Sequence, residues 1–95
     1  MALLEILKDQ SAFGFTGKIN VLIKSSGQFY GVIFQNEGYI VDAHVQNLRG
    51  MKALYRLIFQ DVESDDYLKF IVEPELLSEE NLHIKISFED LKKRD

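Results

Sequence analysis

The chain has 95 residues, a hydrophobic fraction of 46%, a formal net charge of −4 at pH 7 and no cysteine. This length predicts a single domain, and the hydrophobic fraction is typical of a folded globular protein and not of a disordered one. The composition excludes disulfides, thiolate catalysis and cysteine-based zinc sites, and the negative charge argues against a broad surface for nucleic acid.

The amino-terminal stretch 2–9 predicts a short amphipathic helix, because its apolar residues fall on one helical arc with charged residues opposite. Glu5 interrupts the apolar run, so "MALLEILKD" is a poor signal peptide. No other apolar run approaches the roughly 20 residues of a membrane span. We therefore expect a cytoplasmic domain without membrane insertion. In the loop that follows, Phe13 and Phe15 are expected to plug the edge of the core.

Three strands joined by tight turns come next and predict an antiparallel meander. Residues 18–24 alternate apolar and polar, as a half-buried strand does. Residues 28–35 are apolar on both faces, which indicates a central strand, and Gly31 indicates a bulge or a close backbone approach. Gly38 can take a positive φ in the turn before the strand 39–45. On that last strand we expect one face to carry Tyr39, Val41, Ala43 and Val45, and the other Ile40, Asp42 and His44.

The stretch 50–60 predicts a helix whose apolar arc is about twice as wide as a surface helix needs. We expect such a helix to be covered on two sides, by the sheet and by the amino-terminal helix. The acidic stretch 61–66 fails the EF-hand pattern at its turn glycine and its last glutamate, so we expect a solvated acidic loop. Residues 67–73 alternate and predict a fourth strand that Pro74 ends.

The carboxy-terminal stretch 82–88 alternates as well and predicts a fifth strand or an extended segment. Ser87, three residues before Asp90, is an N-cap signal for a final helix from residue 88. Such a helix would be about two turns long at the end of the chain, so either the chain ends in a basic tail or it has been cut from a longer protein. The predicted class is α+β over residues 1–95: an amino-terminal helix, a meander of about three strands, a central helix, one or two further strands and a short carboxy-terminal helix.

The candidate catalytic residue is His44, with Asp42 two residues earlier on the same strand face. A catalytic histidine needs a nucleophile and an orienting carboxylate within reach, and no motif supplies a serine or threonine nucleophile. We therefore favour a partly exposed histidine beside an aspartate, and a hydrolase built on these two residues is the less favoured alternative. His83 is expected to be a surface residue. Phosphate-cradling motifs are absent, and we expect no catalytic residue, metal or cofactor.

Several short motifs follow one another in a fixed order along the chain. They are a leucine-rich amino-terminal helix, Thr16–Gly17–Lys18–Ile19, Phe34 at a strand end, Gly38 in a turn, Ile40–Val41–Asp42–Ala43, and Gly50–Met51–Lys52–Ala53–Leu54. In this order they resemble the PATAN domain family (DUF4388) of bacterial signalling proteins, over essentially the whole chain. The positions that carry the resemblance are structural ones, and we assign the fold signature to Gly17, Phe34, Gly38, Ala43, Gly50, Ala53 and Leu54.

The resemblance implies a bacterial signalling adaptor. Such a domain is a non-enzymatic protein–protein interaction module joined to receiver or other signalling domains, in some cases serving motility and type IV pilus control. The implied partner is a protein of the signalling pathway, and a homodimer is the second option. The alternative function is a sensor of a small ligand or nucleotide, with a pocket between sheet and helix lined by Tyr30, Phe34 and Tyr39.

We expect the binding surface of such an adaptor at the helix over residues 50–60. Aromatic and arginine side chains commonly anchor interfaces, and this segment supplies both. The candidate interface residues are Arg49, Met51, Lys52, Tyr55, Arg56 and Phe59, with Arg49, Lys52 and Arg56 forming a small basic patch. The competing expectation is that Tyr55 and Phe59 only pack under the first helix.

Overall fold

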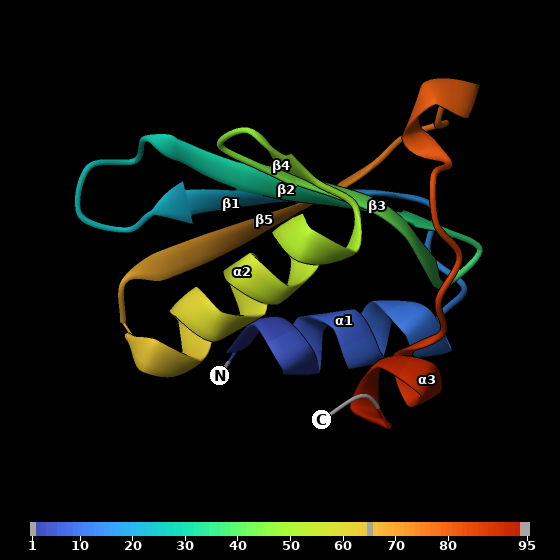
Figure 1. The fold of residues 1–95 in the computed structure, drawn as a ribbon, viewed down its shortest axis with the longest axis horizontal. Coiled ribbons are helices and arrows are strands. Elements are labelled where there is room, and N and C mark those ends of the chain that lie inside the picture. Colours follow the sequence, from blue (N-terminus) through green and yellow to red (C-terminus); the bar gives the residue numbers. More distant parts are fainter. Residues whose placement is uncertain (1, 65, 94–95) are drawn as a thin grey trace.

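The structure is a computed structural model that describes residues 2–64 and 66–93. Within them, an antiparallel sheet of five strands in the order β4-β3-β2-β1-β5 has its helices α1, α2 and α3 on one face (Figure 1). The elements are α1 (Ala2–Ala12), β1 (Gly17–Ile23), β2 (Phe29–Asn36), β3 (Tyr39–Val45), β4 (Leu48–Arg49), α2 (Met51–Glu63), β5 (Leu68–Pro74), the 3-10 turn η1 (Glu79–Asn81) and α3 (Phe88–Lys92). The predicted α+β class and its order of elements are confirmed.

Gly31 lies at a β-bulge and at a close approach, so both interpretations of this glycine are confirmed. Val21 pairs with Gly31 and Leu22 with Phe29, which leaves Tyr30 as the extra residue of β2. A Cβ at position 31 would lie 2.7 Å from the backbone oxygen of His44 and 3.0 Å from a side-chain carbon of Leu57. The missing side chain therefore lets the side chain of Leu57 in α2 lie close to the backbone of β2.

A second bulge decides which side chains of β3 reach the core. Phe34 pairs with Asp42 and Gln35 with Ile40, so Val41 is the extra residue. Because a shift of one residue moves the next side chains to the opposite face, Ile40 joins the core beneath the helices and Val41 packs on the other face of the sheet. The expectation that Val41 shares a face with Ala43, and Ile40 with Asp42, is therefore wrong.

The edge of β3 is covered by two separate segments. At one end, a turn at Gln46–Asn47 leads into β4, which pairs with residues 44–45 and which no sequence pattern predicted. At the other end, the N–H groups of His83 and Ile84 donate to the carbonyl of Val41 at 3.0 and 2.9 Å. The stretch 82–88 is thus an extended segment with an isolated bridge between Ile40 and Ile86, not a full strand.

The predicted caps and turns are confirmed where the structure describes them. Ser87 accepts a hydrogen bond from the N–H of Asp90 at 3.1 Å and so caps α3. Gly38 has a φ of 87°, and Gly50, which precedes α2, has a φ of 71°. Residues 94–95, the end of the predicted final helix, lie outside the described residues, as do residues 1 and 65.

Two of the predicted loops, the one after the first helix and the acidic stretch 61–66, differ from the structure. The first helix continues to Ala12, and Phe13 is exposed instead of plugging the core, whereas Phe15 is half-buried. The acidic stretch is not a solvated loop throughout, because Asp61 lies in the last turns of α2 and is buried. Its Oδ2 accepts a hydrogen bond from the N–H of Leu3 at 3.1 Å, where the positive end of α1 favours a carboxylate. Asp61 therefore ties the two helices together.

Gln35 is a polar residue placed in the core. Its side chain is fully buried, and neither polar atom of its amide has a hydrogen-bond partner among the described residues. An unsatisfied buried amide costs about 1–3 kcal/mol. We expect Gln35→Met, which keeps the length of the side chain, to raise the free energy of unfolding by about 1–2 kcal/mol in urea titrations.

The matched control for this substitution is Gln28→Met, at an exposed position just before β2. We expect that variant to change the stability by less than about 0.5 kcal/mol. A loss of stability in Gln35→Met would show that the amide is satisfied in solution.

Candidate functional site

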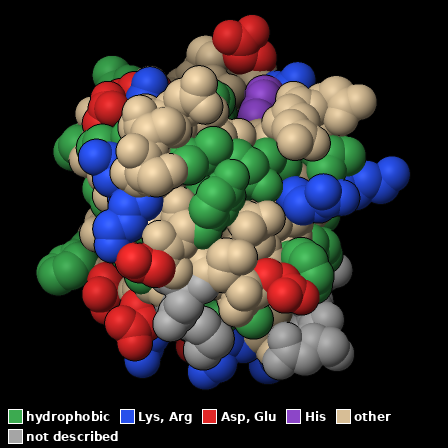
Figure 2. Space-filling model, turned by 90° about the vertical axis from the view of Figure 1, so that its left-hand side faces the viewer, with side chains coloured by type: hydrophobic (Ala, Val, Ile, Leu, Met, Phe, Trp, Pro, Cys, Tyr) green, Lys and Arg blue, Asp and Glu red, His purple; other side chains and the backbone are tan. Residues whose placement is uncertain are grey.

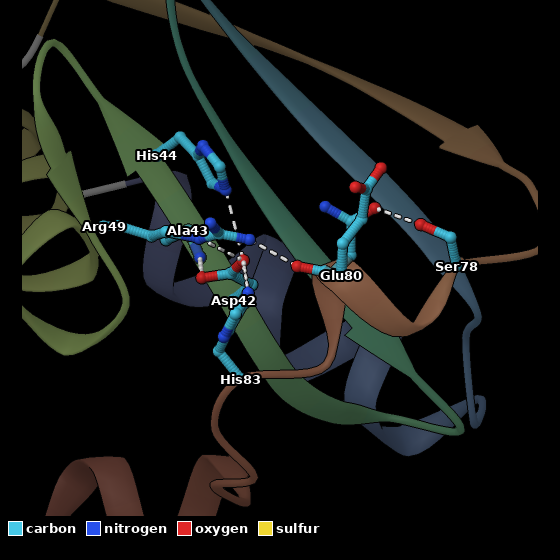
Figure 3. A network of polar contacts seen from close by, with 8 residues as sticks. Asp42, Ala43, His44, Arg49, Ser78, Glu80 and His83 are labelled. Carbon is cyan, nitrogen blue, oxygen red and sulfur yellow. Dashed lines mark hydrogen bonds and ion pairs between the residues drawn. The ribbon is translucent and has the colours of Figure 1, made fainter.

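Four polar side chains meet on the face of the sheet opposite the helices (Figure 3). Asp42 and His44 alternate on β3 and so share this face, and Arg49 of β4 pairs directly across from His44. His83 comes from the extended segment after η1. We call these four residues the Asp42 cluster.

The buried carboxylate of Asp42 is the centre of this cluster. Its Oδ1 accepts a hydrogen bond from the N–H of Ala43 at 2.9 Å. Its Oδ2 accepts one from Nε of Arg49 at 3.1 Å and lies 3.1 Å from Nε2 of His44. Nε2 of His83 is 4.0 Å from the same oxygen. Because a guanidinium and an N–H compensate the buried charge, Asp42 is tolerated in a position with no solvent exposure.

The cluster joins three segments of the chain. Arg49 also donates from Nη2 to the backbone carbonyl of Glu80, at the 3-10 turn after β5. Asp42 itself lies between the part of β3 that pairs with β4 and the part that pairs with the segment at residues 83–86. The cluster therefore links β4 and the segment at residues 83–86, the two segments that cover the edge of β3.

The chemistry open to the Asp42 cluster is limited by its contacts. An imidazole beside a buried carboxylate resembles part of a catalytic triad. However, Arg49 occupies the same oxygen as His44, and in the described part of the chain no hydroxyl group hydrogen-bonds to His44. Among residues 2–64 and 66–93, no group of three or more histidine and acidic side chains is arranged to hold a metal ion. The contacts of the cluster hold neighbouring segments of the chain together.

The surroundings of two residues in the cluster, His83 and Arg49, were not predicted. His83 is exposed on one side, as expected of a surface residue, but its ring also faces Asp42. Arg49 is held on the open face of the sheet by Asp42 and Glu80, so the structure does not bring it together with Lys52 and Arg56 of α2. No local sequence pattern predicts either contact. His83 is distant from Asp42 in the sequence, and the side chain of Arg49 lies on the face of the sheet opposite α2.

The outer side of α2 carries a row of exposed hydrophobic side chains. Tyr55, Phe59 and Val62 are 41%, 60% and 50% exposed, and we call them the α2 stripe. Their spacing of four and three residues places them on one side of the helix. The buried side consists of Ala53, Leu54, Leu57 and Asp61. The expectation that α2 is covered by the sheet and by α1 is confirmed, but this cover leaves the α2 stripe outside. The competing expectation that Tyr55 and Phe59 only pack under α1 is wrong, because Phe59 is largely exposed and Tyr55 is only partly covered.

An apolar groove lies beside the α2 stripe, between the three helices. Its volume is about 300 Å³, and it is lined by Leu4, Tyr55, Ile58, Leu91 and Lys92. Tyr55 thus belongs both to the stripe and to the wall of the groove. Figure 2 looks onto the end of the molecule that carries the β1–β2 turn and the end of α2, and there hydrophobic side chains lie exposed between acidic and basic ones.

The remaining candidate residues take different positions. Lys52 and Arg56 are exposed on α2, and Met51 is partly buried against the core. Tyr30 packs with the core beneath the helices, whereas Phe34 packs on the opposite face. Tyr39 lines a separate hollow of about 230 Å³ near the β2–β3 turn. The structure therefore does not bring Tyr30, Phe34 and Tyr39 together around one pocket.

The fold-signature residues occupy structural positions. Ala43, Ala53 and Leu54 are fully buried in the core where α2 packs on the sheet.

No family model, curated protein or solved structure matches this chain. In the described part of the chain, no helix combines the length and apolar character needed to cross a membrane.

Proposed function

We propose that this chain is a non-enzymatic protein–protein interaction module, a cytoplasmic adaptor of bacterial signal transduction that binds a partner protein through the outer side of α2. The observation that carries the proposal is the α2 stripe, a row of exposed aromatic and aliphatic side chains next to an apolar groove. The resemblance of the motifs around Gly17, Gly38 and Gly50 to the PATAN family supports the signalling setting.

The α2 stripe has the composition of a binding surface. Aromatic side chains bury a large area with few rotatable bonds, and tyrosine is enriched among the residues that dominate binding energy. Tyr55 and Phe59 are one helical turn apart and have apolar Val62 beyond them. Lys52 and Arg56 are exposed on the same helix and would form part of the polar rim that surrounds such a surface.

Partner capture with matched variants tests the proposal. The double variant Tyr55→Ala/Phe59→Ala removes both aromatic anchors, and each anchor typically contributes more than 1 kcal/mol to binding. We expect the variant to bind the proteins that the wild-type chain retains from a lysate of its own organism at least roughly thirtyfold more weakly, because the two losses together exceed about 2 kcal/mol. Arg56→Glu is expected to weaken the same partners to a smaller extent, because it alters the rim.

The control is Leu76→Ala, which removes a side chain that is 95% exposed but lies away from the helices, after β5. Circular dichroism establishes that all variants are folded. If the captured proteins are the same for the wild type, the double variant and the Leu76 control, the α2 stripe is not the binding surface.

A further inference from the structure

Within residues 2–64 and 66–93 the sheet has one long free edge, at β5. Among the described strands, β5 has β1 as its single neighbour. The opposite edge is shorter, because β4 is Leu48–Arg49 and the segment at residues 83–86 covers the rest of β3. An uncovered edge strand presents backbone groups that are able to pair with another strand.

The hydrogen bonds next to β5 show which of its backbone groups point outward. The N–H of Lys24 donates to the carbonyl of Tyr67 at 2.8 Å, and the N–H of Glu75 donates to Thr16 at 3.3 Å. In an antiparallel ladder every second residue bonds to the same neighbour. Lys69, Ile71 and Glu73 alternate with Tyr67 and Glu75, so their backbone groups also bond to β1. The backbone groups of Leu68, Phe70 and Val72 therefore point outward. Pro74, which has no N–H, falls in the outward phase and ends the edge.

The side chains along β5 are complementary to those of a second copy of the same strand that runs antiparallel to it. Lys69, Ile71 and Glu73 alternate on β5 and share the open face of the sheet. Ile71 is 43% exposed, and the exposed Lys69 and Glu73 stand two residues before and after it. Turning such a strand about its middle places a lysine opposite a glutamate on both sides of an isoleucine pair.

We propose that two copies of this chain form a homodimer by antiparallel pairing of their β5 strands, with a two-fold axis at Ile71. In this register Phe70 of one copy exchanges backbone hydrogen bonds with Val72 of the other. The outward-pointing groups of both strands are thereby used. Ile71 meets Ile71 in a pair that is not hydrogen-bonded, and Lys69 lies opposite Glu73 on each side.

The partner at the β5 edge is a second copy of this chain, because the charges along β5 are complementary to the same charges read in the opposite direction. A closed two-fold contact uses the same patch on both chains, which the sequence Lys69–Phe70–Ile71–Val72–Glu73 satisfies. The sheets of the two copies become one continuous sheet. This interface is on the sheet edge, so it is separate from the α2 stripe and does not depend on the proposed adaptor function.

Cross-linking through a single introduced cysteine tests the register. The chain contains no cysteine, so Ile71→Cys supplies the only thiol. Facing residues of a pair without hydrogen bonds have Cα atoms about 4.5 Å apart, within the range that a disulfide spans. We expect Ile71→Cys to form a disulfide-linked dimer under mild oxidation at least roughly tenfold faster than Leu76→Cys, an exposed position away from the edge.

Lys69→Cys is a second control on the same strand. Its thiol would face Glu73 of the other copy, so it is expected to cross-link slowly with itself. The variant Tyr55→Ala/Phe59→Ala in the Ile71→Cys background should cross-link as fast as Ile71→Cys alone. Equal rates for Ile71→Cys and Leu76→Cys would overturn the dimer, and a faster reaction of Lys69→Cys would overturn the register.

Sedimentation equilibrium with charge-reversed chains tests the pairing independently. Lys69→Glu faces glutamate against glutamate twice in the dimer, and we expect the dimer dissociation constant to rise roughly tenfold or more. The double variant Lys69→Glu/Glu73→Lys restores the opposite charges and should recover most of the affinity. Lys8→Glu, on α1, has the same net charge as the single variant and should leave the dimer unchanged. A wild-type chain that is monomeric at several hundred micromolar, or a double variant as weak as the single one, would contradict the proposal.

Discussion

Gly17→Ala is expected to lower the free energy of unfolding by about 3 kcal/mol, because a side chain at this position has no room. A Cβ there would lie 2.3 Å from the backbone oxygen of Glu73 and 2.9 Å from Cα of Pro74. These backbone atoms belong to β5, which pairs with β1 along its whole length. They cannot move aside unless the two strands separate at this end. Urea denaturation followed by circular dichroism gives the stability of each variant.

Gly27→Ala is the matched control for Gly17→Ala. Gly27 also has a positive φ, of 74°, but a Cβ at this position would have no atom within 4 Å among the described residues. That substitution costs only the backbone strain of a left-handed alanine, about 1–2 kcal/mol. The difference between the two variants therefore measures the steric overlap at the β1–β5 junction. Equal losses in both would show that the junction is more open than the structure has it.

Asp42→Ala is expected to lower the free energy of unfolding by about 3 kcal/mol, because it removes the centre of the Asp42 cluster. Arg49 and His44 lose the acceptor they share, and the N–H of Ala43 loses its hydrogen bond to Oδ1. The expected loss is at the low end for a broken buried pair, because Arg49 and His44 are partly exposed and can be solvated when Asp42 is absent. Thermal and urea unfolding of purified variants measure the effect.

Asp66→Ala is the control for Asp42→Ala. Asp66 pairs with Lys24 at 2.5 Å, but the carboxylate is largely exposed, and such surface pairs contribute little. We expect its removal to leave the unfolding midpoint nearly unchanged. If Asp42→Ala were as harmless as Asp66→Ala, the cluster would not link the segments that cover the edge of β3, and another role for Asp42 and His44 would have to be considered.

The positions of the elements were predictable because they depend on local patterns. Alternation predicts strands, the arc of apolar residues predicts α2, and Ser87 with Asp90 predicts the start of α3. Gly31 even indicated the bulge in β2. These signals act within a few residues, so a single sequence is enough to detect them.

The bulge at Val41 and the strand β4 were not predictable in the same way. Val41 is an ordinary strand residue, and the register against β2 is what makes it the extra one. β4 exists because the end of β3 offers free backbone groups to residues 48–49. Both features depend on which strand lies alongside, and a one-residue change in register exchanges the two faces.

The candidate sites divide along the same line. The sequence by itself determined that α2 carries more apolar side chains than a small core needs, and that Asp42 and His44 share a face, since both follow from helical and strand periods. Only the tertiary structure decided that Tyr55 and Phe59 remain outside, that Arg49 turns to Asp42, and that Asp61 is buried at the start of α1. The reason is physical: a period says which residues lie together on an element, whereas burial and pairing depend on what the rest of the chain places against it.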